Sequence, residues 1–107
     1  EEQLQGLRLQ ALTEPSALST GPGIDRAVVA DEFAGKICTL GNVDPIALLQ
    51  LGSASQVAAE TDRQVRLMGR GGMILNSGEC VPREAKAPNL HTMADSARKV
   101  WNLIQQR

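Results

Sequence analysis

The stretch KICTLGNVDPIALLQLG, residues 36–52, contains a complete strand–turn–helix pattern. Residues 36–40 read as a buried strand. After the turn, Asp44 is of a residue type that caps helices, and Pro45 suits the first helical position. Gly52 is a natural stop for the helix that follows. A strand that leads at once into a helix is the building unit of a parallel α/β sheet.

A second unit follows downstream. A helix is expected over residues 53–68, because Ser53 opens a capping box before an apolar-periodic segment. Residues 73–75, Met-Ile-Leu, read as a second buried strand, and residues 76–88 as a long polar loop. Asn89 is expected to cap a last helix whose apolar residues recur at helical spacing.

The segment upstream gives weaker signals. Leucines and an alanine at helical spacing predict a helix over residues 3–12. Residues 19–23, Ser-Thr-Gly-Pro-Gly, are the strongest loop signal in the chain. Residues 24–30 contain two adjacent valines and are expected to form a short strand, with one helical turn over residues 31–34.

The expected architecture is therefore α/β with parallel β/α units. Residues 1–35 would form an N-terminal helix, a loop and a weak β/α unit, and residues 36–107 two further β/α units. A complete eight-fold barrel needs about 250 residues, so a chain of 107 is incomplete as a barrel. In parallel sheets the chemistry gathers in loops after the strand carboxyl ends, here residues 41–45 and 76–88.

Composition narrows the function classes. Eleven basic and twelve acidic residues leave no positive surplus, and only 2% of residues are aromatic, which argues against nucleic-acid binding. No apolar run approaches the length of a membrane span. Two cysteines do not make a disulfide framework, so we expect reduced thiols and a cytoplasmic protein. A mature secreted chain whose leader was removed stays open.

Several residues of the two loops could carry chemistry. Cys80 could be a nucleophile, a zinc ligand or a thiol without a role. Glu79 could act as a general acid or base or as a carboxylate ligand, or could simply be solvated. A helix cap accounts for Asp44 but not for Asn42, so this pair is a candidate for binding a ligand at the mouth of the first strand.

Three pieces of the chain resemble a known family. They are KICTLGNVDPIALLQLGSASQVAAE at residues 36–60, GGMILNSGECVP at 71–82 and APNLHTMADSARKVW at 87–101. Together they resemble the C-terminal part of the uroporphyrinogen decarboxylase superfamily. That superfamily includes uroporphyrinogen decarboxylase and the zinc-dependent methyltransferases that act on corrinoid proteins. The shared features are a GN-[LV]-DP motif, a leucine-rich turn, a helix start, an IL-x-x-G loop and a proline–asparagine helix start.

The resemblance implies the closing units of a TIM-type barrel. It implies a tetrapyrrole or a corrinoid protein as partner, together with homo-oligomer formation or association with the rest of a barrel. The family has Gly-His-Gly or Gly-Cys-Gly in the loop where this chain has Gly78-Glu79-Cys80. Cys80 therefore stands one residue later than the usual thiolate, and Glu79 occupies the usual ligand position.

The resemblance favours the methyltransferase branch, in which zinc lowers the pKa of a thiol substrate that then attacks a methyl-corrinoid. Cys80 would be a metal ligand, Glu79 a catalytic residue, and Asn42 and Asp44 would bind substrate. The alternative is the decarboxylase, which needs no cofactor and in which Arg83 would hold substrate carboxylates. A third possibility is a non-catalytic partial barrel that associates with itself. The chain is too short for the whole active site of either enzyme.

Overall fold

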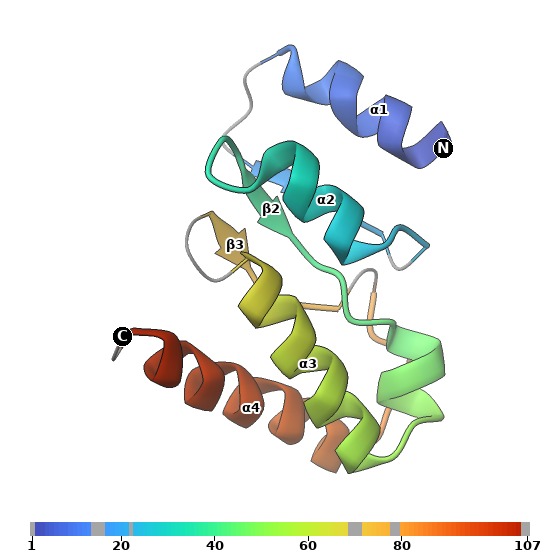
Figure 1. The fold of residues 1–107 in the computed structure, drawn as a ribbon. Helices are drawn as coiled ribbons and strands as arrows, with labels where there is room; N and C mark the ends of the chain where they lie inside the picture. Colours follow the sequence, from blue (N-terminus) through green and yellow to red (C-terminus); the bar gives the residue numbers. More distant parts are fainter. Residues whose placement is uncertain (1, 14–16, 22, 69–71, 78–79, 106–107) are drawn as a thin grey trace.

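The structure is a computed structural model that describes residues 2–13, 17–21, 23–68, 72–77 and 80–105. Helices and strands alternate along most of the chain (Figure 1). In chain order the elements are α1 (Glu2–Ala11), β1 (Ala17–Ser19), α2 (Arg26–Phe33), β2 (Cys38–Leu40), the π-helix η1 (Pro45–Gln50), α3 (Ala54–Met68), β3 (Met73–Ile74) and α4 (Ala87–Gln105).

The three strands form one parallel sheet in the order β1-β2-β3. Leu18 of β1 is in register with Thr39 of β2, and Thr39 is in register with Met73 of β3. Residues in register point to the same face of a sheet. The parallel pairing of the strands, together with the helices between them, confirms the expected α/β class. The structure shows an open three-stranded sheet, which is consistent with a partial α/β unit.

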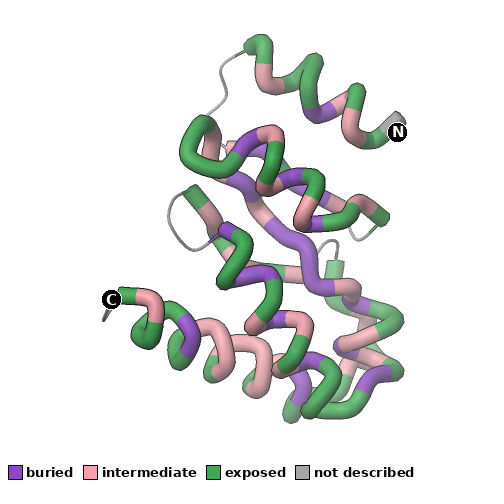
Figure 2. The backbone as a smooth tube through the Cα atoms, in the orientation of Figure 1, coloured by how far each residue is buried: buried purple, intermediate pink, exposed green. Residues whose placement is uncertain are grey.

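Two apolar clusters stabilise the chain. The first joins α1, β1 and α2 through Leu7, Leu18, Val29 and Phe33, which are all buried. The second contains Val43, Leu49 and Val57, with side chains of the loop before α4 and of α4 itself packed against it. In Figure 2 the buried segments accordingly lie in the middle of the molecule, while the outer sides of the helices are exposed.

The prediction of a strand at residues 24–30 is wrong, because most of that segment belongs to helix α2. The Asp25 side chain accepts a hydrogen bond from the backbone N–H of Ala27 and caps the helix. Val29 is fully buried against the first cluster, whereas its neighbour Val28 is 40% exposed. One valine of the pair thus packs in the core, and this packing outweighs the modest preference of valine for strands.

The first strand of the sheet, β1, was not predicted. It has only three residues and follows residues 14–16, which lie outside the described part of the chain. Such a short segment carries no periodicity that a sequence pattern could detect. Its pairing with β2, and the burial of Leu18 beneath α1 and α2, hold it in place.

The last helix begins at Ala87 rather than at Asn89. The Asn89 side chain does not cap its own helix. Instead its amide nitrogen lies 3.2, 3.1 and 2.9 Å from the carbonyl oxygens of Leu48, Leu49 and Gly52. These carbonyls lie at the end of η1, and those of Leu48 and Leu49 also accept backbone hydrogen bonds from Gly52 and Lys86. Asn89 therefore joins the start of α4 to the end of η1.

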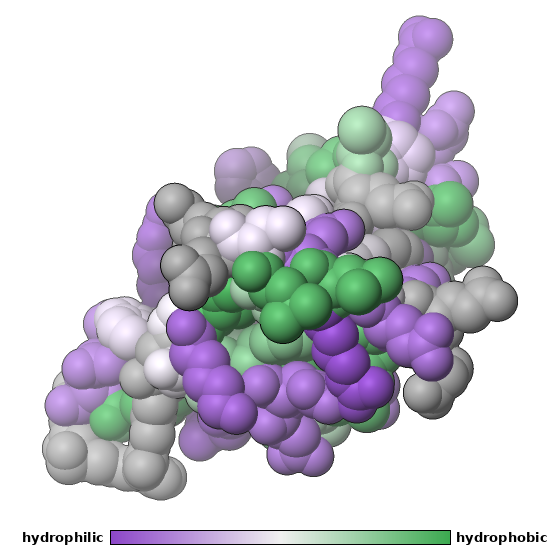
Figure 3. Space-filling model, turned by 90° about the horizontal axis from the view of Figure 1, so that it is seen from above, coloured by the Kyte–Doolittle hydropathy of each residue, from purple (hydrophilic) through white to green (hydrophobic). Residues whose placement is uncertain are grey.

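Some large apolar side chains remain on the surface. Figure 3 shows a patch of apolar residues bordered by hydrophilic ones on the face seen from above. Across the described residues, the most exposed large apolar side chains include Leu12 at 79%, Leu51 at 69% and Ile74 at 53%. None of the helices in this part of the chain has the length and apolar character needed to cross a membrane.

Candidate functional site

The two loops singled out from the sequence lie side by side at the carboxyl edge of the sheet. β2 and β3 are parallel neighbours, so both chains leave the sheet at the same edge. The pairing continues beyond the strands, because Val43 forms a parallel bridge with Ser77. The segment 41–45 therefore lies beside the start of the segment 76–88, in the region where parallel α/β proteins bind ligands.

Asn42 is buried, with only 5% of its surface exposed. Its side-chain amide donates hydrogen bonds of 2.8 Å to the carbonyl oxygens of Gly21 and Ile24. Its backbone N–H donates to Oε1 of Gln64 on α3, at 3.1 Å. Asn42 thus holds the loop after β1 against the loop after β2. Its Oδ1 atom is buried and has no hydrogen-bond partner among the described residues.

Asp44 caps the π-helix η1. Its Oδ1 atom accepts hydrogen bonds from the backbone N–H groups of Ile46, at 2.9 Å, and Ala47, at 2.8 Å. The helix start predicted at Asp44 and Pro45 is confirmed. The carboxylate of Asp44 therefore binds the backbone at the start of η1. Asp44 is half-buried and lies at the carboxyl edge of the sheet.

Arg26 is a functional candidate that the sequence did not reveal. Its side chain is 1% exposed and reaches from the start of α2 to the end of β2, where it donates to Thr39 Oγ1 at 2.9 Å and to the carbonyl of Gly41. Burial lowers its pKa to about 10, so the guanidinium is charged at neutral pH. A correct helix prediction would have revealed it, because Arg26, Val29 and Phe33 share one helical face.

A pocket of about 240 Å³, which we call the rim pocket, lies between the loops after β1 and β2 and helix α3. Its lining includes the buried side chains of Arg26 and Asn42. It also includes the carboxylates of Asp25, Asp44 and Glu60. The rim pocket therefore combines both signs of charge with buried amide and guanidinium groups.

An ion-pair group lies at the α3 side of the rim pocket. Arg63 lies 3.0 Å from Glu60 and 3.5 Å from Asp25. Burial alone would raise the pKa of Glu60, but hydrogen bonds from Arg63 and Gln64 lower it below its ordinary value. The hydrogen bond to Glu60 in turn raises the pKa of Arg63. Both groups therefore carry full charge at neutral pH.

The other predicted site residues lie apart from this pocket. Cys80 and Arg83 are exposed on the loop that follows β3, and neither contributes to the lining of the rim pocket. Glu79, the predicted catalytic residue, lies outside the described residues, as does Gly78. Of the five predicted site residues, the structure brings only Asn42 and Asp44 together in one pocket.

The described side chains do not fit a zinc ion. Zinc in proteins is held by three or four side chains, mostly cysteine, histidine, aspartate or glutamate. Within the described ranges, no group of three or more such residues lies close enough together to hold a metal ion. Cys80 is an exposed thiol without such a group around it.

Fold and site together define a parallel α/β protein with its polar loops at the carboxyl edge of the sheet. The family model of uroporphyrinogen decarboxylase matches residues 3–100, which is nearly the whole chain. The chain therefore belongs to the uroporphyrinogen decarboxylase superfamily, and the resemblance seen in the sequence is confirmed. No curated protein matches the chain in a sequence comparison.

Proposed function

We propose that this chain is part of an enzyme of the uroporphyrinogen decarboxylase superfamily and supplies two loops of its active site. The observation that carries the proposal is the family match over residues 3–100. The bridge between Val43 and Ser77 supports it, because it places both loops at the edge where such sheets bind ligands. In this proposal the chain forms closing units of a TIM-type barrel, and the rest of the barrel completes the active site.

The first candidate is a relative of the methyltransferases that act on corrinoid proteins. Its support is the exposed thiol of Cys80, which follows β3 on one of the two loops. An exposed thiol is accessible to a metal ion or to a thiol-reactive substrate. Because the described donors do not complete a zinc site, we derive no catalytic step through zinc.

Zinc content tests this candidate. The full chain would be purified as wild type, as Cys80→Ser and as Cys38→Ser. Cys38 is the matched control, since it is the other free cysteine and lies half-buried on β2. A metal-binding role of Cys80 requires the zinc content of Cys80→Ser to fall below that of the wild type and of Cys38→Ser. Equal zinc in all three proteins, or none in any, would contradict a metal-binding role of Cys80.

The second candidate is a decarboxylase that removes carboxylate groups from a tetrapyrrole. The family model carries that name, and Arg83 is an exposed cation on the loop after β3. Guanidinium groups bind carboxylates through paired hydrogen bonds. We expect Arg83→Gln to weaken the binding of uroporphyrin, followed by its fluorescence, whereas Arg98→Gln on the exposed side of α4 leaves it unchanged. Equal affinity of both variants would count against this role of Arg83.

A third candidate is a partial barrel that associates with itself and has no catalytic activity. Its support is the open sheet, because the described residues place no strand beside the outer edge of β1 or of β3. Unpaired strand edges favour pairing with another chain.

A further inference from the structure

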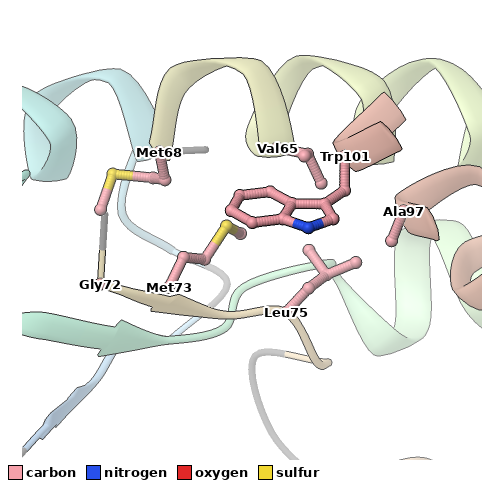
Figure 4. Close-up of a pocket in the computed structure, with 7 residues that line it drawn as sticks. All are labelled: Val65, Met68, Gly72, Met73, Leu75, Ala97 and Trp101. Carbon is pink, nitrogen blue, oxygen red and sulfur yellow. The ribbon is translucent and has the colours of Figure 1, made fainter. Parts of the chain in front are cut away.

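A second cavity is lined by α3 residues that do not line the rim pocket. It has a volume of about 190 Å³, lies between α3, β3 and α4, and is partly open to solvent (Figure 4). Val65 and Met68 of α3 form a buried wall. The indole of Trp101 extends from α4 between Val65 and Met73, and it is 46% exposed. The cavity therefore has a buried interior and an opening at Trp101.

The lining of this cavity is apolar. Besides Trp101 and Met73, the half-buried Leu75 and Ala97 contribute to it, and no charged side chain of the described residues does. A bound water molecule needs two or more polar partners, so water is a poor occupant of such a space. An engineered apolar cavity of about 150 Å³ in another protein stays dry and binds benzene. This cavity is of comparable size.

The residues at the cavity favour an aromatic over an aliphatic occupant. The indole of Trp101 offers a flat π-surface, and aromatic rings pair favourably with one another in stacked or edge-on arrangements. Met68 and Met73 add two thioether sulfurs, which make favourable contacts with ring edges. We propose that this cavity is a binding site for a small neutral aromatic molecule of about one ring. The proposal does not depend on the proposed function.

The three methionines of the chain allow a direct test. Met68 and Met73 line the cavity, whereas Met93 packs against the separate core cluster of Val43, Leu49 and Val57. The full chain, with isotope-labelled methionine methyl groups, would be titrated with benzene and followed by NMR. We expect saturable shifts of the Met68 and Met73 methyl signals and none of the Met93 signal. Shifts that do not saturate, or that affect all three methionines alike, would overturn the proposal.

A pair of variants gives the second arm of the test. Ala97→Leu places extra carbon atoms in the cavity, and Ala59→Leu makes the same change at an exposed position of α3. We expect Ala97→Leu to abolish the saturable shifts and Ala59→Leu to preserve them. Retained binding in a folded Ala97→Leu variant would overturn the proposal. So would Met68 and Met73 signals that move with protein concentration in the absence of benzene, since a second copy of the chain would then cover the cavity.

Discussion

Buried polar side chains hold the carboxyl end of β2 in place. Arg26 on α2 donates hydrogen bonds to Thr39 and Gly41. Asn42, the residue after Gly41, donates hydrogen bonds from its side chain to two carbonyl oxygens of the loop after β1. Gly41 has a φ of +120°, and a Cβ atom there would lie 2.4 Å from the carbonyl oxygen of Thr20. A glycine is therefore required at this close approach. Packing and hydrogen bonds within the chain therefore account for both residues of the GN motif.

We expect Arg26→Lys to lower the free energy of unfolding by about 1–3 kcal/mol, because the single ammonium nitrogen of lysine does not reproduce the planar fork whose two nitrogens donate to Thr39 and Gly41. Denaturation by urea measures this difference. Arg66→Lys, at an exposed position of α3, is the matched control and should change stability by less than about 0.5 kcal/mol. Equal effects of the two substitutions would show that the contacts of Arg26 contribute little.

Of the roles of Asp44, Asn42 and Arg26, some could be predicted from the sequence and others could not. The cap at Asp44 followed from local chemistry, because aspartate before proline is a common helix start. The buried hydrogen bonds of Asn42 did not, since its partners Gly21 and Ile24 come from another loop. Arg26 was missed because a strand was expected at residues 24–30, so the helical face that it shares with Val29 and Phe33 was not recognised.

At the scale of elements, α2 depends on the cap that Asp25 supplies. Its carboxylate accepts a hydrogen bond of 2.8 Å from the N–H of Ala27. We expect Asp25→Ala to lower the free energy of unfolding by about 1 kcal/mol. Asp31→Ala, at an exposed position within the same helix, is the control. Circular dichroism during urea unfolding measures both, and equal losses would contradict the capping role.

The ion-pair group on α3 predicts a dependence on pH. Because its pKa is lowered in the folded protein, Glu60 adds stability above its unfolded pKa of about 4.5, and this contribution is lost as pH falls through the lower folded value. We expect wild type to be more stable than Glu60→Gln at pH 7, with the difference shrinking below pH 4.5. Glu84→Gln, an exposed substitution in the loop before α4, is the control for acid unfolding. A constant difference across this range would contradict the assignment.

The elements from residue 36 onward were easier to predict than those before it. The capping box expected at Ser53 is formed, with Gln56 Oε1 accepting from the N–H of Ser53 at 2.9 Å. Helix α3 follows it over Ala54–Met68, as expected. Among the strands, β2 and β3 were expected at residues 36–40 and 73–75 and are present, whereas the three-residue β1 was not expected. Short strands are selected by their pairing partners, which lie far away in the sequence.

At the scale of the whole molecule, the open sheet provides a test of self-association. Ile74 of the outer strand β3 is 53% exposed. If copies pair through this strand, we expect Ile74→Lys to shift the protein from oligomer to monomer in sedimentation, because a lysine at a strand edge opposes pairing. Leu12→Lys, at a residue that is 79% exposed beyond α1, should leave the oligomer intact. A wild-type protein that sediments as a monomer at all concentrations would rule out self-association.

The strand–helix units from residue 36 onward, and the membership of the chain in its superfamily, could be predicted from the amino-acid sequence. These features are local, because capping residues, apolar periodicity and ordered motifs lie within short stretches of chain. Three further features became evident only in the folded chain. Residues 26–33 form a helix, β1 pairs with β2, and Arg26 and Asn42 both line the rim pocket. The physical reason is that burial and strand pairing depend on partners distant in the sequence, and their contribution outweighs local propensity.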